Sequence, residues 1–284
     1  MDTFKHVFRP AVWIAMLTFA FTTMVSMVLA DHRNPPQVYL MFDGIDDYVQ
    51  VEHHADLSIA TTGQLTVAVW MKPATLYFPT TERDGYVHWL GKGGHNQHEW
   101  AFRMYSKDTI DSESPRQCPD GPLITTRQNR ISFYVFNPDE ASQGVGSYFQ
   151  YAYTPCAVLP QPVKAGEWIH VVGIADGERT HIYKDGILMD SDRYSGTIRP
   201  TVGEEPLRMG TRELDKSYFL GGLGEIRIWN RALSHLEVSE LYHFNRVPKG
   251  LVAQWLLNER TGTTALDTIG GHHGTIFGAY RPVR

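Results

Sequence analysis

The chain has 284 residues, a length that corresponds to one large domain or two small ones. Charged residues make up 20% of it and hydrophobic residues 42%, a balance that is typical of a folded globular protein and argues against intrinsic disorder. The net charge of −5 and the presence of only two cysteines argue against a nucleic-acid-packaging protein and a disulfide-dense miniprotein. Nucleic acid is therefore not expected as a partner.

Residues 1–30 differ from the rest of the chain. Lys5 and Arg9 form a short positive start, and residues 11–30 carry no charge. Small residues lie at the third and first positions before Asp31, which is the pattern of a signal-peptide cleavage site. The uncharged run is also long enough to act as an uncleaved membrane anchor. In either case the sequence predicts a secreted or extracytoplasmic protein, on the cell surface or in the periplasm, whose only contact with a membrane would be this segment.

Short alternating or apolar runs, each closed by turn residues, follow along the chain. These runs cover residues 38–42, 48–52, 65–71, 99–105, 131–136, 168–175, 179–184 and 225–229. Alternation with a period of two predicts strands that have one buried face. Asp185-Gly186 stands between two such runs and predicts a tight hairpin turn. Many short strands with almost no long helix predict an all-β fold, an antiparallel β-sandwich.

The stretch from about residue 106 to residue 162 is rich in proline and predicts an irregular loop insertion at one rim of the sandwich. It contains both cysteines, Cys118 and Cys156. An even number of cysteines in an exported chain favours a disulfide between them, although two separate buried thiols remain the alternative.

One helix is predicted near the end of the sandwich, over residues 235–244. Ser234 and Glu237 have the spacing of a capping box, which marks a helix N-terminus. We expect Leu236 and Leu241 to hold this helix against the sandwich.

Four segments in this order resemble the laminin-G-like (LamG), concanavalin A-like lectin/glucanase domains. They are residues 42–49 (Phe42-Asp43-Gly44-Ile45-Asp46-Asp47-Tyr48-Val49), 65–73, 167–186 and 207–242. The resemblance implies a jelly roll with one short helix, which we assign to residues 31–247. Residues 250–279 resemble the segment that commonly precedes the Phe-Asp-Gly motif in this family. We therefore expect residues 248–284 to add strands to the same sandwich, the alternative being the start of a truncated second repeat.

The resemblance also implies a calcium ion near the Phe-Asp-Gly motif. Asp43, Asp46 and Asp47 would supply carboxylates in a tight turn, and Glu225 would approach from a later strand. The alternative is that these aspartates only form turns, where aspartate is common. The chain also departs from the family at Gly224, where an aspartate is usual, and this puts the ion in doubt.

Histidines occur as neighbours at His53-His54 and His272-His273. A further pair, His95 and His98, is separated by two residues. None of these pairs lies on a predicted helix, where fixed spacing would bring imidazoles together. We interpret all of them as solvated loop residues rather than metal ligands.

No complete catalytic motif is found. The paired carboxylates of jelly-roll glucanases are matched only by residues 82–86, which lack the final Glu. The Arg-Glu-Arg strand of jelly-roll alginate lyases is matched only by Arg212-Glu213, without the last Arg. No catalytic residue is therefore proposed from the sequence.

Binding is the remaining interpretation. Sugar sites combine an aromatic face with converging polar groups, and the predicted rim offers aromatic side chains for this purpose. The candidate ligand-binding residues are Trp89, Trp100, Tyr148, Tyr151 and Tyr153. We interpret the chain as an exported, non-catalytic module that recognises a carbohydrate, with calcium as its only candidate cofactor. The alternatives are an adhesion or assembly module that binds an extracellular protein and, third, a polysaccharide-degrading glycosidase or lyase with an atypical site.

Overall fold

The computed structural model of the protein describes residues 35–82, 85–94, 97–106, 115–117, 123–125, 130–137, 140–150, 163–194 and 203–282. The predicted signal segment, the two cysteines, Tyr151 and Tyr153 lie outside these ranges, so the predictions made for them remain predictions. Among the residues inside the ranges, no helix is both long enough and apolar enough to cross a membrane.

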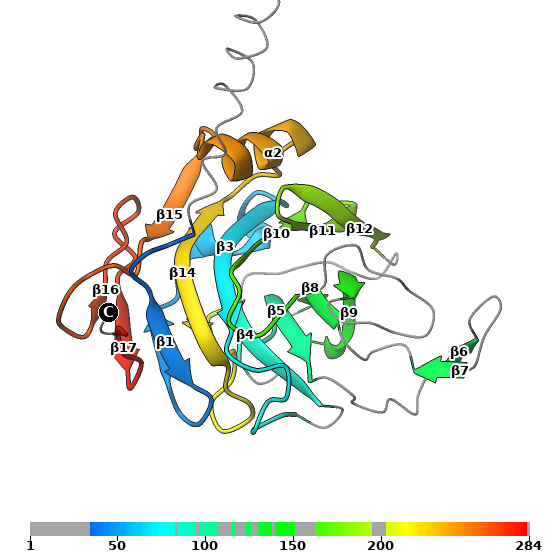
Figure 1. The fold of residues 1–284 in the computed structure, drawn as a ribbon. Helices are drawn as coiled ribbons and strands as arrows, with labels where there is room; N and C mark the ends of the chain where they lie inside the picture. The colour runs from blue at the N-terminus through cyan, green and yellow to red at the C-terminus, as the bar shows by residue number, and fades with distance from the viewer. Residues whose placement is uncertain are drawn as a thin grey trace, which may run out of the picture.

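Two antiparallel sheets pack face to face and confirm the predicted β-sandwich (Figure 1). The first sheet contains, in spatial order, β1 (Leu40–Asp43), β14 (Leu220–Trp229), β3 (Leu65–Pro73), β10 (Ile169–Ala175), β11 (Arg179–Lys184) and β12 (Ile187–Arg193), with β15 (Leu251–Trp255) also paired to β14. The second contains β16 (Thr264–Ala265), β17 (Gly274–Phe277), β2 (Tyr48–Val51), β13 (Leu207–Met209), β4 (Tyr86–Lys92), β5 (Trp100–Tyr105), β8 (Arg130–Asn137) and β9 (Glu140–Gln150). A separate hairpin is formed by β6 (Pro115–Gln117) and β7 (Leu123–Thr125).

The main hydrophobic core lies between the two sheets. Leu65, Val67, Val69 and Met71 are all fully buried, at alternate positions of β3. This is the pattern that the sequence predicted for a strand with one face in the core. A smaller cluster on the other side of the first sheet is covered by α2 (His235–Phe244), so β3 is buried on both of its faces.

The predicted hairpin between β11 and β12 is confirmed. Asp185 and Gly186 both have positive φ, at 51° and 79°, as a two-residue turn of the favoured hand requires.

The structure corrects the prediction that residues 106–162 form an irregular insertion. β8 confirms the strand predicted at residues 131–136, and β9 is a second long strand of the same sheet that the sequence did not predict. The sequence did not predict β9, because it contains glycines and glycine by itself weakens a strand. A Cβ atom at Gly144 would lie 2.7 Å from the ring of Phe136, and one at Gly146 would lie 2.6 Å from the ring of Tyr134. The two glycines therefore allow β9 to approach the aromatic side chains of β8.

The predicted helix is confirmed over the same residues, with both hydrogen bonds of the capping box between Ser234 and Glu237. Leu241 is buried as expected, together with Val238. The prediction for Leu236 is wrong, because its side chain is 66% exposed. A helix turns by about 100° per residue, so Leu236 lies on the face opposite to the one that packs on the sheet.

The helix cap provides a first testable prediction. We expect Ser234→Ala to lower the free energy of unfolding by about 1 kcal/mol, because the N–H of Glu237 loses its acceptor. Leu236→Ala is the control on the same helix and should change it by less than about 0.5 kcal/mol. Urea unfolding of both variants measures the difference. Equal effects would contradict the roles given to the two side chains.

The C-terminal segment contributes strands to both sheets. β15 pairs with β14 in the first sheet, while β17 pairs with β2 in the second. The backbone of Tyr280 also bridges to Met41. This pairing places the end of the chain beside the turn that follows β1, where the candidate site lies.

Candidate functional site

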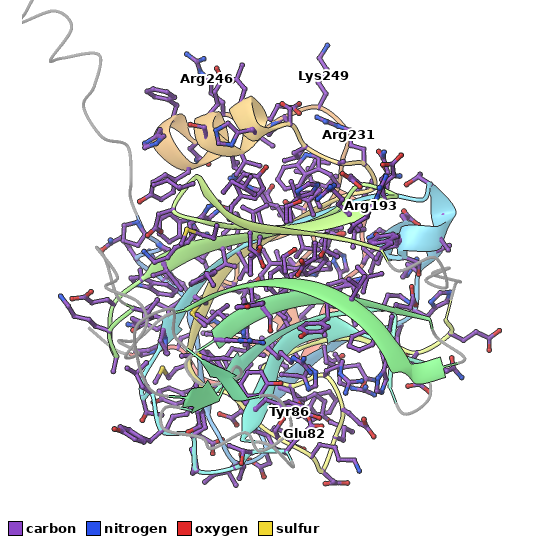
Figure 2. The ribbon with its side chains drawn as sticks, turned by 90° about the vertical axis from the view of Figure 1, so that its right-hand side faces the viewer. Glu82, Tyr86, Arg193, Arg231, Arg246 and Lys249 are labelled. Atoms are coloured by element: carbon purple, nitrogen blue, oxygen red, sulfur yellow. The ribbon has the colours of Figure 1, made fainter. Side chains whose placement is uncertain are left out.

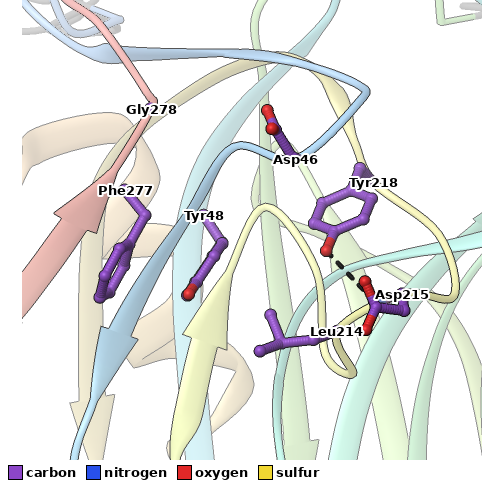
Figure 3. A pocket seen from close by; sticks show the side chains of 7 residues that line it. All are labelled: Asp46, Tyr48, Leu214, Asp215, Tyr218, Phe277 and Gly278. Carbon is purple, nitrogen blue, oxygen red and sulfur yellow. Dashed lines mark hydrogen bonds between the residues drawn. The ribbon is translucent and has the colours of Figure 1, made fainter.

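A pocket of about 340 Å³ opens where the turn between β1 and β2, the loop before β14 and the end of β17 meet. Figure 3 shows the residues that line it, which are Asp46, Tyr48, Leu214, Asp215, Tyr218, Phe277 and Gly278. Its volume falls within the range of small-ligand sites, about 300–1,000 Å³.

Aromatic side chains form one wall of this pocket. Tyr48 and Phe277 are direct partners on neighbouring strands, and their rings stack with centroids 4.5 Å apart and an angle of 15° between their planes. Phe277 is 41% exposed, an unusual position for a phenylalanine with no core role. Tyr218 faces them from the other side, and its hydroxyl accepts a hydrogen bond of 3.2 Å from the backbone N–H of Asp215 (Figure 3).

Carboxylates supply the polar part of the pocket. Asp46 and Asp215 are both exposed at its rim. Asp215 has a φ of 61°, which turns the loop sharply and brings its backbone N–H to Tyr218. No basic side chain of the described residues lines the pocket, so the lining that they form is aromatic and acidic.

Asp46 also belongs to a second group of carboxylates beside the pocket. Oxygen atoms of Asp43, Asp46 and Asp47 all lie within 4.8 Å of one another. The turn that gathers them depends on Gly44, whose φ is 79°. The structure therefore brings together three of the four residues predicted as calcium ligands.

The negative charges of this aspartate group are only partly compensated. The Asp43 carboxylate accepts the N–H of Ile45 at 2.8 Å, and Asp47 accepts the N–H of Asp43 at 2.9 Å. Burial and the two neighbouring carboxylates nevertheless raise the pKa of Asp47 to about 6. No hydrogen bond within the described ranges reaches either carboxylate oxygen of Asp46. A hard cation with oxygen ligands, such as Ca²⁺, fits this donor set and would relieve the repulsion.

The fourth predicted calcium ligand is wrong. Glu225 forms an ion pair with Arg227 at 2.6 Å and accepts a hydrogen bond from Gln254. Asp43 pairs with Leu220, so Glu225 lies five residues further along β14, roughly 16 Å away. The departure from the family at Gly224 has a physical reason, since a Cβ atom there would lie 2.1 Å from Pro36.

The predictions for Trp89 and Trp100 are also wrong. Both side chains are fully buried in the core between the sheets, so neither can stack on a ligand. Trp89 packs on Phe102 at a centroid distance of 4.8 Å, and the Nε1–H of Trp100 donates to the carbonyl of Leu57. The sequence placed both at the rim of the sandwich as aromatic residues, and it did not show that β4 and β5 direct them into the core.

Tyr148 lies on β9 at the edge of the second sheet and is half-buried. The guanidinium of Arg130 covers its ring at 3.6 Å from the centroid, which leaves at most one ring face for a ligand. Its role in binding stays a prediction.

Sequence reasoning missed Phe277, Tyr218 and Asp215. A signal for Phe277 was present, because Ile276 and Phe277 are adjacent apolar residues in one strand. Neighbouring side chains of a strand point to opposite faces, so one of the two had to leave the core. The loop that contains Tyr218 and Asp215 reaches Tyr48 and Phe277 only through tertiary packing, so the local sequence carries no signal for it.

A separate polar cluster contains the incomplete enzyme motifs. Glu82 and Tyr86 lie close together at the end of the sandwich opposite α2 (Figure 2). The Glu82 carboxylate accepts hydrogen bonds of 2.9 Å from His88 and from Ser217.

The ionisation of this cluster does not suit acid–base catalysis. Burial opposes the charge of Glu82, but the bonds from His88 and Ser217 and the charge of Arg212 lower its pKa to about 2. Burial lowers the pKa of His88 to about 3 and raises that of Tyr86 to about 12. A general acid or base works best with a pKa near the working pH, and none of these three pKa values lies near neutral pH.

Comparison with known proteins gives a partial match to one family and a shared fold. Residues 113–239, just under half of the chain, match the laminin G family described as the concanavalin A-like lectin/glucanases superfamily. No curated protein matches the sequence.

Two solved structures share the fold. One is a Bacteroides ovatus protein to which carbohydrate binding is ascribed, with a TM-score of 0.54 and 14% identity over 87% of this chain. The present chain spans only 60% of that protein. The other is a native heptameric SAP-like pentraxin from Limulus polyphemus, with a TM-score of 0.54 and 15% identity over 88% of this chain and 96% of the pentraxin. Identity this low shows the fold alone, and the shared fold confirms the predicted jelly roll.

Proposed function

Since this protein carries a concanavalin A-like jelly roll of the laminin G type, we propose that it binds a carbohydrate in the pocket formed by Tyr48, Phe277 and Tyr218. The observation that carries the proposal is the combination of an exposed aromatic wall with two carboxylates in one pocket. An aromatic ring packs against the apolar face of a pyranose, while carboxylates accept hydrogen bonds from its hydroxyl groups. The carbohydrate binding ascribed to the Bacteroides ovatus protein of the same fold is consistent with this role.

The charge of the pocket narrows the ligand class. Within the part of the chain that the structure describes, Asp46 and Asp215 are the charged residues that line it. Without a cation they would repel uronic acids and sulfated sugars, so the preferred ligand is a neutral or amino sugar at the end of a glycan.

Calcium is proposed as the partner of this site. Asp43, Asp46 and Asp47 would hold the ion, and Asp46 would connect it to the pocket, because it belongs to both groups. Ca²⁺ takes six to eight oxygen ligands, and one oxygen each of Asp43 and Asp47 already accepts a backbone N–H, so positions would remain for water or for sugar hydroxyl groups. The ion would neutralise the negative charge of these aspartates and so weaken their repulsion of acidic sugars.

We place this binding outside the cytoplasm, and the uncharged segment at residues 11–30 supports that location. No chemical step is assigned to the pocket. Its role is to orient and hold the glycan.

A glycan array with purified protein, run with calcium and with chelator, tests the proposal. We expect binding to neutral or amino-sugar termini, and an affinity about tenfold lower for Phe277→Ala, because the stacking surface is removed. Tyr280→Ala is the matched control, since Tyr280 is another exposed aromatic residue of the C-terminal segment and does not line the pocket. Asp46→Asn should weaken both calcium binding and glycan binding.

Two outcomes would contradict the proposal. The first is equal loss of binding in Phe277→Ala and Tyr280→Ala, and the second is glycan binding that survives both Phe277→Ala and Asp46→Asn. Absence of binding across a broad array, with calcium present, would shift the weight to the protein-binding alternative.

A further inference from the structure

A second group of metal-binding side chains lies away from the pocket, on residues that the sequence did not suggest as ligands. His54 precedes the short helix η1 (Ala55–Leu57), and His272 lies just before β17. The fold brings their rings to a centroid distance of 4.2 Å. Asp56 joins them, with its Oδ2 3.4 Å from Nε2 of His272. Ligand atoms of all three residues lie within 4.8 Å of one another.

A buried carboxylate faces the other nitrogen of His272. Its Nδ1 lies 3.0 Å from Oδ2 of Asp267, whose side chain is fully buried. Asp267 is itself fixed by backbone N–H groups, since it accepts hydrogen bonds from Gln254, Ile269, Gly270 and His272. Nδ1 of His272 forms no hydrogen bond to a described residue, so Asp267 lies beside the ring without fixing its tautomer, and Nε2 is the nitrogen that faces Asp56. A carboxylate beside the second nitrogen is the common surrounding of a histidine that binds a metal.

Two buried tryptophans fix the segments that carry these residues. The Nε1–H of Trp100 donates to the carbonyl of Leu57, next to Asp56, at 2.9 Å. The Nε1–H of Trp255 donates to the carbonyl of His272, also at 2.9 Å. Both tryptophans are fully buried, so the two segments are held before any ion binds.

We propose that His54, Asp56 and His272 bind a divalent transition-metal ion of the zinc class. Two imidazoles and one carboxylate are donors that zinc favours, and water would complete a four-coordinate site. Zinc bonds of about 2.0–2.1 Å in a tetrahedron place neighbouring ligand atoms about 3.3 Å apart. The distance of 3.4 Å between His272 and Asp56 already meets this spacing. The carboxylate of Asp56 is 47% exposed, which gives the ion a route from solvent.

The position of the site indicates what the ion does. It joins the segment after β2 to the C-terminal segment, which already contacts the sandwich through strand pairing and through buried core residues. An ion bound to both segments favours the folded state over the unfolded one, because the ligands come together only on folding. The site is therefore a structural clamp on the C-terminal segment, distinct from the aspartate group beside the pocket.

Zinc binding to the tag-free full chain tests the proposal. After treatment with chelator, we expect calorimetry to detect one class of zinc site, and Co²⁺ at the same site to give the visible absorption of a tetrahedral complex. His54→Ala and Asp56→Asn should each weaken zinc binding by at least about tenfold. These two side chains are exposed or half-exposed, so both variants should remain folded, and the melting temperature of the apo form checks this. Zinc should raise the melting temperature of the wild type and not that of His54→Ala.

Two controls separate this site from other binding. His235→Ala removes an exposed histidine from α2 and should leave zinc affinity unchanged. Asp46→Asn should lower calcium binding without changing zinc binding, so failure of the pocket proposal and failure of this one can be distinguished. The proposal is overturned if the wild type takes up no zinc at micromolar concentrations, or if His54→Ala and His235→Ala bind zinc equally well.

Discussion

Replacing Glu99 with Gln will lower the free energy of unfolding by about 3–5 kcal/mol, because it leaves a buried ammonium group without its counter-charge. Lys92 and Glu99 form an ion pair in which the side chains are 0% and 1% exposed. The Nζ of Lys92 also donates to the carbonyls of Gly203 and Glu205, at 3.0 and 3.2 Å.

The directions of the two pKa shifts agree with this expectation. Burial lowers the pKa of Lys92 and raises that of Glu99, while the attraction between the two charges opposes both shifts. Glutamine has nearly the same shape and can still accept a hydrogen bond, so the variant removes mainly the charge.

A double-mutant cycle measures the pair itself. Lys92→Met, Glu99→Gln and the double variant should show a coupling of about 1–3 kcal/mol, because the second change costs less after the first. Glu167→Gln is the surface control, since Glu167 faces Lys164 at 3.2 Å with both side chains more than half exposed. That variant should change the stability by less than about 1 kcal/mol. Similar effects of Glu99→Gln and Glu167→Gln in urea unfolding would show that the buried pair is not needed.

Mild acid, between about pH 6.5 and 5, should already destabilise the protein, because two histidines are buried in the neutral form. Burial lowers the pKa of His88 and of His170 to about 3, from 6.5. Arg227 adds to the shift at His170, whose ring packs against Trp70 and Tyr242.

The sign follows from proton binding in the two states. Between about pH 6.5 and 3 the unfolded chain binds protons at both histidines and the folded chain does not, so stability falls as pH falls. Each histidine contributes a slope of about 1.4 kcal/mol per pH unit. Asp47 has the opposite effect on stability. Its pKa is raised from 3.8 to about 6, so between these pH values the folded chain binds a proton that the unfolded chain does not, and this stabilises the folded state as pH falls. Calcium bound to Asp47 should remove this opposition.

Urea unfolding at about pH 7 and about pH 5 measures the slope. In His170→Asn the slope of the unfolding free energy against pH should fall by the contribution of one histidine, because asparagine does not titrate. This holds whatever the stability of the variant at neutral pH. An equal pH dependence in wild type and variant would contradict the neutral burial of His170. Calcium should make the wild-type slope steeper, and Asp47→Asn should remove that effect.

Much of the fold could be predicted because its signals are local. The alternation in β3, the Asp185-Gly186 turn and the Ser234 cap each involve residues close together in the sequence, and each is confirmed. Strands rich in glycine could not be found in this way. β9 was missed, because the advantage of glycine there is the close approach of aromatic side chains on β8.

The candidate site was predictable only in part. Asp43, Asp46 and Asp47 lie within one turn, so their grouping follows from the local sequence. Trp100 and Phe277 were harder, since both are aromatic strand residues and only the packing of the two sheets decides that the first is buried and the second exposed. Strand periodicity gives two faces and does not say which one the other sheet covers.

By itself the sequence determined the strands with one buried face, the hairpin, the capped helix and the aspartate turn, because each depends on neighbouring residues. The tertiary structure decided which aromatic side chains reach solvent, placed Glu225 against Gln254 of β15, and joined His54 to His272. These contacts link residues whose separation along the chain carries no periodic signal. They exist only because β15 and β17 add to the two sheets and carry the C-terminal segment to the turn after β1 and to the segment after β2.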